Sequence, residues 1–191
     1  MVCNSKEGNS ACESSLILIL GISGVGKTSL SVEYAERNSG FRSISASSLI
    51  AEKKLGLSPA TLDEIRRNQE ALVSSVLHQK QDNPGTTLLL DGHAAIETPS
   101  GASAIPDDVF DRIQPTAIVL VYDDPVEISA RRFLKKKSGN VEHVKNLQIL
   151  ERELSSMHAR RIGIPYREVR SGSFGEFSSV IADLTAKAKH S

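Results

Sequence analysis

Short apolar or β-branched runs recur along the chain, and the stretches between them carry apolar residues three or four positions apart. The short runs are typical of buried strands, and the longer spacing is typical of helices with one buried face. We expect five strands, over residues 15–20, 41–45, 86–90, 116–122 and 166–170. Strands that alternate with helices form a parallel sheet covered by helices on both faces. The pattern therefore predicts an α/β protein.

Five helices are expected after these strands, over residues 27–37, 61–78, 125–137, 141–162 and 176–189. The second helix opens with TLDE, in which Thr61 and Glu64 form a capping box. Its predicted buried stripe is Leu62, Ile65, Leu72 and Val76. The predicted stripe of the fourth helix is Val144, Leu147, Leu150, Leu154 and Met157. Each stripe marks the helix face that we expect to pack on the sheet.

The chain is 191 residues long, which suits one domain around one core. We expect this domain over residues 15–191, after a disordered polar tail over residues 1–14. The tail holds both cysteines, Cys3 and Cys12, without paired spacing or nearby histidines, so no metal site is expected there. The 23 basic and 23 acidic residues balance, so nucleic acid is not an expected partner.

The apolar runs are too short to indicate a membrane protein. The longest purely aliphatic ones, over residues 16–20 and 88–90, fall far below the roughly 20 residues that a membrane-spanning helix needs. The first residues, MVCNSKEGNSACESS, lack a basic cluster followed by an apolar segment, so they do not predict a signal peptide. We therefore expect a cytoplasmic protein without a membrane partner.

The first specific chemistry follows the first strand, in the sequence GISGVGKT. It fits the phosphate-loop pattern G-x-x-x-x-G-K-[ST], and its position between a buried strand and an amphipathic helix is the expected one. Glycines let the backbone curl closely around a phosphate chain, so that many N–H groups donate to it, and the helix that follows adds a partial positive charge. The expected nucleotide contacts are Gly21, Ser23, Gly24, Val25, Gly26, Lys27, Thr28 and Ser29.

Two side chains of this loop have individual roles in the pattern. Lys27 is expected to reach the β- and γ-phosphates, and the hydroxyl of Thr28 is expected to bind Mg²⁺. The sequence therefore predicts a site for a nucleoside triphosphate with its magnesium ion.

The third predicted strand is followed directly by Asp91. In phosphate-loop proteins a carboxylate at this position lies beside the loop and holds Mg²⁺, usually through water. The alternative is an aspartate that begins an ordinary turn with Gly92. His93 could contact a substrate phosphate, orient a water molecule, or cap a turn or helix.

From residue 16 to about residue 169 the chain resembles the archaeal-type adenylate kinases and related P-loop nucleotide kinases. The resemblance rests on the phosphate loop, on SASSLIAEKKLGL and EIRRNQ, on LLLDGHAAIETPSG and AIPDDVF, and on PVEISARRF and QILER. DGH is also similar to the D-x-H sequence of a related group of kinases with additional ATPase activity.

The resemblance implies a three-layer α/β/α fold with a five-stranded parallel sheet of order 2-3-1-4-5. It also implies an acceptor-binding part over about residues 46–82 and a lid over about residues 131–152 that closes over the phosphates. The implied reaction is transfer of the ATP γ-phosphate to a nucleoside monophosphate. ATP, Mg²⁺ and a small phosphate acceptor are therefore the expected ligands.

Phosphoryl transfer relies on positioning and charge neutralisation, so a kinase needs guanidinium groups around the phosphates. Arg66 lies four residues after Leu62, near the expected buried stripe, and is preferred for the acceptor phosphate. The resemblance places lid arginines at Arg131 and Arg132, one of which stacks on adenine, and Arg132 is preferred. It places a phosphate contact of the helix that leaves the lid at Arg152. Each of these could instead be a surface or structural arginine.

The lid region departs from the family, because it carries KKKSGNVEHV where alternating arginines and aspartates are usual. A lysine supplies point charge without the two-pronged geometry of a guanidinium group. This favours a second hypothesis, a slow ATPase that serves as a nucleotide-dependent switch or assembly factor. A GTPase is disfavoured, since the sequence has no N-K-x-D motif for reading guanine.

Overall fold

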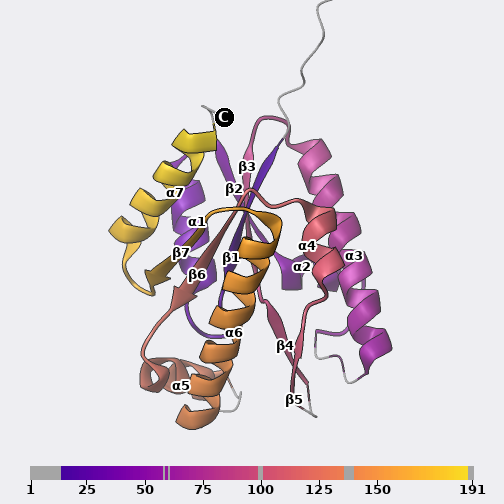
Figure 1. The fold of residues 1–191 in the computed structure, drawn as a ribbon, viewed down its shortest axis with the longest axis vertical. Coiled ribbons are helices and arrows are strands. Elements are labelled where there is room, and N and C mark those ends of the chain that lie inside the picture. Colours follow the sequence, from indigo (N-terminus) through magenta and orange to yellow (C-terminus); the bar gives the residue numbers. More distant parts are fainter. Residues whose placement is uncertain (1–13, 58, 60, 99–100, 136–139, 189–191) are drawn as a thin grey trace, which may run out of the picture.

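Five parallel strands form the centre of the computed structural model, which describes residues 14–57, 59, 61–98, 101–135 and 140–188 (Figure 1). They are β1 (Ser15–Leu20), β2 (Phe41–Ser45), β3 (Thr87–Gly92), β6 (Ala117–Tyr122) and β7 (Tyr166–Arg170). Their order across the sheet is β2-β3-β1-β6-β7. When only the strands of this sheet are numbered, the order is 2-3-1-4-5, as the resemblance implied. A separate antiparallel hairpin, β4 (Ala95–Thr98) and β5 (Gly101–Ala104), was not predicted.

Seven helices occur in the described part of the chain, and five of them match the predicted ones closely. These are α1 (Lys27–Arg37), α3 (Leu62–Asp82), α5 (Pro125–Leu134), α6 (Val141–Ile162) and α7 (Phe174–Ala188). The other two, α2 (Ala46–Glu52) and α4 (Asp107–Ile113), have seven residues each and were not predicted. A helix of seven residues has only about two turns, which is too short for the repeat of apolar residues that predicts a helix to be recognised.

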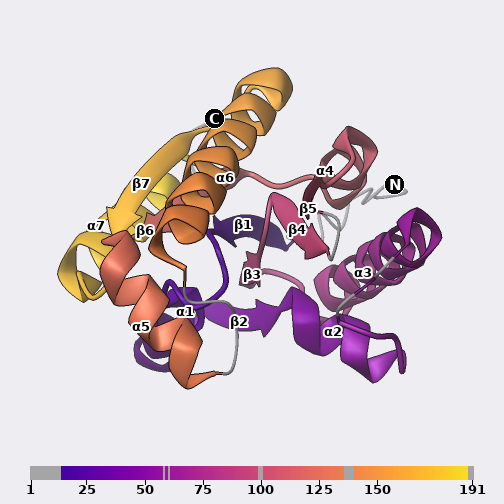
Figure 2. The ribbon, with the colours of Figure 1, turned by 90° about the horizontal axis from the view of Figure 1, so that it is seen from below.

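The sheet separates two hydrophobic cores, because alternate residues of a strand point to opposite faces. Leu16, Leu18 and Leu20 of β1 face a core that α2, α3 and α4 cover. Ile17 and Ile19 face the other core, which α1 and α7 cover. Figure 2 shows the sheet edge-on between these two layers of helices. The arrangement is the predicted three-layer α/β/α sandwich.

The capping box at the start of α3 is confirmed. The Thr61 hydroxyl accepts from the Glu64 N–H, and the Glu64 carboxylate accepts from the Thr61 N–H, both at 3.2 Å. The predicted stripe is wrong at its first position, since Leu62 is 68% exposed. Leu62 lies in the first turn of α3, which extends beyond the sheet-packing part of the helix that includes Leu72 and Val76.

The buried face of α6 is rotated from the predicted stripe. Val144 and Leu147 are buried as expected, but Met157 is 47% exposed. The buried positions farther along the helix are mostly polar, namely Glu151, Ser155 and His158, with Ala159 as the apolar exception. An apolar pattern cannot find a helix face whose buried residues are polar.

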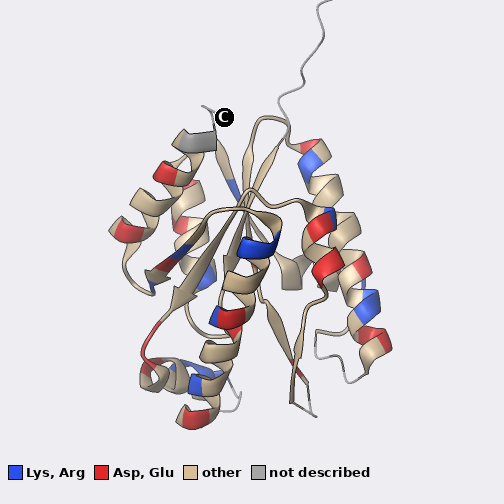
Figure 3. Ribbon diagram, viewed as in Figure 1, with Lys and Arg blue, Asp and Glu red and all other residues tan. Residues whose placement is uncertain are grey.

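Charge lies mainly on the helices, while β1 and β6 contain no charged residue (Figure 3). No helix among the described residues is both long and apolar enough to span a membrane. Ser14, which we expected in the tail, is buried and donates a hydrogen bond to the carbonyl of Lys80 at 2.8 Å. The rest of the predicted tail, with Cys3 and Cys12, lies outside the described residues.

Candidate functional site

The loop between β1 and α1 has the glycine requirement of a phosphate-binding loop. Gly21, Gly24 and Gly26 all have positive φ, of 147°, 86° and 111°. A Cβ atom on Gly21 would lie 2.4 Å from the carbonyl oxygen of Val121, and one on Gly26 would lie 2.6 Å from the hydroxyl of Ser171. Both the conformation and the space therefore exclude a side chain at these positions.

The first turn of α1 keeps its backbone donors available to an anion. Gly26 is the N-cap residue and provides no side-chain cap, and no acidic residue lies in this turn. The first N–H groups of a helix have no partner within the helix, and its N-terminus carries partial positive charge. Thr28 and Ser29, both exposed, lie in this turn. The geometry suits a phosphate chain, as the sequence predicts.

Lys27 is buried and folded over its own loop. Its ammonium group donates to the carbonyl oxygens of Gly21 at 2.7 Å and Ile22 at 3.3 Å, and lies 3.5 Å from the Asp91 carboxylate. The ammonium group of Lys27, the N-terminus of α1 and several backbone N–H groups therefore lie close together in the loop.

Asp91 lies beside the loop because β3 is the neighbour of β1 and both strands end at the same edge of the sheet. In the register, Asp91 pairs with Ile19. The Thr28 hydroxyl donates to the Asp91 carboxylate. A hydroxyl and a carboxylate are oxygen donors of the kind that Mg²⁺ prefers, and Mg²⁺ usually takes its other ligands from phosphates and water. The two residues therefore fit a nucleotide-bound Mg²⁺.

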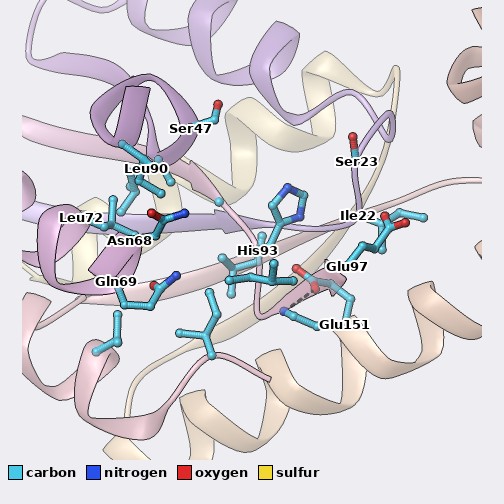
Figure 4. Close-up of a pocket in the computed structure, with 18 of the residues that line it drawn as sticks. Ile22, Ser23, Ser47, Asn68, Gln69, Leu72, Leu90, His93, Glu97 and Glu151 are labelled. Atoms are coloured by element: carbon cyan, nitrogen blue, oxygen red, sulfur yellow. Dashed lines mark hydrogen bonds between the residues drawn. The ribbon is translucent and has the colours of Figure 1, made fainter. Parts of the chain in front are cut away.

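A cavity of about 530 Å³ opens next to the phosphate loop (Figure 4). Aliphatic side chains of β1, β3, α2, α3 and α4 make up most of its wall, among them Leu20, Ile50 and Leu72. The polar residues that line it are fewer: Ser23, Ser47, Asn68, Gln69, His93, Glu97, Arg132 and Glu151. The volume and the mixture of apolar wall and few polar groups are typical of a small-molecule site.

His93 lies half-buried in the wall of this cavity, two residues beyond Asp91 (Figure 4). Among the loop residues, Ser23 also lines the cavity, whereas Val25 is fully buried in the core beneath the loop. The structure thus brings the third-strand residues and the phosphate loop to one side of one cavity.

Arg132 comes from α5 and lies against the phosphate loop, with 1% of its side chain exposed. Its guanidinium group makes two parallel hydrogen bonds of 2.7 Å to the carboxylate of Glu97, on the hairpin. It also donates to the Ser23 carbonyl at 3.4 Å. His143 of α6 lies 3.5 Å from the same carboxylate. Glu97 therefore joins the hairpin to α5 and α6, and the sequence analysis did not single it out.

Glu97→Gln is expected to lower the free energy of unfolding by about 1 kcal/mol, because Glu97 is more than a third exposed and water screens the pair. The hydrogen bonds from Arg132 hold the pKa of Glu97 below its ordinary value of 4.5. This carboxylate therefore stabilises the fold above that pH, and its contribution is lost as the pH falls through the lowered pKa. Urea unfolding between pH 3 and pH 7 should show the variant and the wild type converging at low pH.

Exposed Glu127, on α5, gives the matched control for this change. Glu127→Gln should leave the free energy of unfolding unchanged at both ends of the pH range. A Glu97→Gln variant as stable as the wild type at pH 7 would contradict a stabilising role for the pair.

Arg131 also contacts the loop, although Arg132 was preferred from the sequence. Its guanidinium group donates to the Val25 carbonyl at 3.3 Å and to the Ser171 hydroxyl at 3.4 Å, and it pairs with Asp123. Consecutive residues of a helix differ by about 100° in direction, so the two arginines reach the loop from different sides. Both belong to the candidate site.

Arg66 and Arg152 lie apart from these groups. Arg66 is exposed on α3 and is not part of the cavity wall. Arg152 is bound to Glu168 of β7 at 3.1 Å, and its guanidinium carbon lies 5.3 Å from the centre of the Tyr122 ring. Their contacts with phosphate stay predictions.

Parallel strand order, a glycine loop and an adjacent strand-end acid together define a P-loop protein that is similar to nucleoside monophosphate kinases. The sequence pattern of the AAA domain family AAA_17 matches residues 20–148. The chain belongs to this family.

A curated relative is a kinase. An adenylate kinase of Methanopyrus kandleri is 29% identical over an alignment of 128 residues, and the match covers 61% of this chain and 65% of that protein. The chain thus matches less than two thirds of the length of this relative.

Solved structures with the same fold cover nearly the whole chain. A shikimate kinase from Acinetobacter baumannii has a TM-score of 0.61 at 14% identity and covers 92% of this chain and 95% of its own. A gluconokinase from Sinorhizobium meliloti has a TM-score of 0.55 at 16% identity, covering 93% and 94%. A thymidylate kinase from Candida albicans has a TM-score of 0.54 at 15% identity, covering 93% of both chains. At these identities the likeness establishes the fold alone.

Proposed function

We propose that this protein transfers the γ-phosphate of ATP to a nucleoside monophosphate or a related small acceptor. The observation that carries the proposal is the position of the cavity, directly beside the phosphate loop and the residues after Asp91. A donor site and an acceptor site that share one wall bring the two reactants together, and positioning is the main requirement of phosphoryl transfer. The adenylate kinase relative supports the same reaction.

The chemistry of the cavity favours an acceptor with a flat apolar part and an N–H donor. Its walls are mainly aliphatic, which suits a nucleobase better than a polyhydroxy acid. The side-chain oxygen of Gln69 is buried and has no hydrogen-bond partner among the described residues. An unpaired buried acceptor costs free energy, and a donor on the acceptor molecule would satisfy it.

The two moving parts that we propose follow from these positions. The acceptor-binding part, over about residues 46–82, corresponds to α2 and α3, which supply Ser47, Asn68 and Gln69 to the cavity. The lid, over about residues 131–152, includes the end of α5 and the first half of α6. Residues 136–139 of the lysine-rich stretch predicted in the lid lie outside the described residues.

Each group at the site has a role in the proposed reaction. Lys27 and the first N–H groups of α1 would hold the β- and γ-phosphates, and Arg132 with Arg131 would neutralise charge on the transferred group. Thr28 and Asp91 would hold Mg²⁺, whose positive charge would help to neutralise the phosphates of the nucleotide. His93, at the cavity wall, would contact the acceptor. Arg66, in the acceptor-binding part, would contact the acceptor phosphate, and Arg152 would reach phosphate when the lid closes.

A screen of acceptors with Mg-ATP tests this function. We expect ADP formation to rise at least about tenfold over the acceptor-free rate with one or more nucleoside monophosphates, since bound reactants gain a large entropic advantage. ADP and free phosphate should be measured separately, with gluconate and shikimate as polar comparison acceptors. ADP formation at background with the whole panel of monophosphates would exclude the proposed reaction.

A second candidate function, a slow ATPase that works as a switch, is favoured by one observation. The arginines near the loop are held by carboxylates, Arg131 by Asp123 and Arg132 by Glu97. Guanidinium groups already paired in this way neutralise a transferring phosphoryl group poorly unless the pairs open. This function predicts that phosphate release equals ADP formation and is insensitive to every acceptor.

A further inference from the structure

A buried carboxylate on α6 holds together the two loops of the candidate site. Glu151 is 1% exposed. One of its oxygens accepts from the N–H of Gly21 at 3.0 Å and from the N–H of Ala94 at 2.7 Å. The other accepts from the N–H of Ala95 at 3.0 Å. Figure 4 shows Glu151 at the cavity wall, on the side of α6 that faces the loops.

The three N–H groups belong to segments that carry the proposed chemistry. Gly21 is the first residue of the phosphate loop, at the end of β1. Ala94 and Ala95 directly follow Asp91, Gly92 and His93, and Ala95 begins the hairpin that carries Glu97. Glu151 is 130 residues from Gly21 and 57 from Ala94 along the chain. One side chain therefore connects three distant parts of the sequence.

The charge of Glu151 is costly in this place. Burial raises the pKa of its carboxyl group, although the three N–H donors and nearby Lys27 act in the opposite direction. A buried charge contributes little net stability, whereas hydrogen bonds to a charged acceptor are strong and directional. The main effect of this buried carboxylate is therefore to fix the geometry of the two loops, and its net contribution to stability is small.

We propose that Glu151 is a positioning residue, which ties α6 to the phosphate loop and to the β3–β4 turn so that they keep one relative arrangement. The geometry alone carries this coupling, and only its effect on turnover rests on the proposed kinase function. Both carboxylate oxygens are engaged by backbone donors. Glu151 therefore acts through Gly21 and the residues next to His93, not by contact with a reacting group.

The test compares Glu151→Gln with Glu153→Gln, a matched change at an exposed position of the same helix. A glutamine keeps the size and one acceptor oxygen, but its amide N–H₂ faces a backbone donor. We expect amide hydrogen exchange to become at least about tenfold faster at Gly21, Ala94 and Ala95 in Glu151→Gln and to be unchanged in Glu153→Gln. With an active acceptor, kcat should fall about 10- to 100-fold while KM for ATP stays within about threefold, as expected for misplaced reacting groups.

Wild-type exchange at these three amides in a folded Glu151→Gln variant would overturn the proposal, whatever its turnover. If the variant does not fold, a pH titration of the wild-type protein followed by NMR tests the proposal instead. The N–H signals of Gly21, Ala94 and Ala95 should shift with pH at one common midpoint, and independent behaviour would overturn the coupling. The exchange and NMR measurements need no acceptor, so absence of kinase activity leaves their result intact and rejects only the proposed reaction.

Discussion

Lys27→Ala is expected to lower ADP formation by about 100-fold or more, as the loss of a preorganised charged donor does in other active sites. The lysine is the only ammonium group that the described structure places within the phosphate loop, 3.5 Å from Asp91. Without it, charge that develops on the β- and γ-phosphate oxygens would lose its ammonium donor and would depend on the backbone N–H groups, the two arginines and Mg²⁺. Initial rates at saturating Mg-ATP, with the best acceptor of the screen, measure the effect.

The variant also changes the loop itself, so folding must be measured with activity. The ammonium group donates to the carbonyl oxygens of Gly21 and Ile22, and its loss should lower the free energy of unfolding by about 1–3 kcal/mol. Arg160→Ala is the matched control, because it removes one exposed positive charge near the end of α6, just before the turn that leads into β7. A folded Lys27→Ala enzyme with turnover near that of Arg160→Ala would contradict our placement of the active site.

Local patterns were sufficient to predict the sheet, its class and the phosphate loop. β1 and β6 are almost continuous apolar runs, as buried parallel strands should be, and GISGVGKT encodes its conformation through glycines with positive φ. The hairpin was missed because its two strands have four residues each and its sequence, AIETPSGASA, has no regular apolar alternation. Its position depends on contacts with α6 and Arg132, which lie far away in the sequence.

The pairing of charged residues could not be predicted from the sequence. Glu151 belongs to the turn of α6 where the resemblance indicated a role for its neighbour Arg152, and the apolar residues of that helix predicted a different buried face. Once the helix is placed, Glu151 points at Gly21 and Ala94 and is the buried residue, whereas Arg152 turns towards Glu168. An acidic residue at the inward position of a helix is a signal only after the tertiary structure identifies that position.

The second large effect is expected for Asp91→Asn, which should lower turnover by about 100-fold or more. An asparagine keeps the size of the side chain and an oxygen for the Thr28 hydroxyl, but it removes the negative charge that faces Lys27 and the expected Mg²⁺. Turnover should be measured as a function of Mg²⁺ concentration, and the variant should need more Mg²⁺ than the wild type. Asp183→Asn, at an exposed position of α7, is the control.

If Asp91 and Thr28 act on the same ion, their effects should not be independent. Thr28→Val removes the hydroxyl at nearly constant volume, and we expect it to slow turnover as well. In a double-mutant cycle, Thr28→Val should add little to the loss already caused by Asp91→Asn, since groups that share one function are not additive. If the double variant loses the product of the two single losses in turnover, and each single variant needs the same Mg²⁺ concentration as the wild type, the two residues act independently. That result would reject a shared magnesium site.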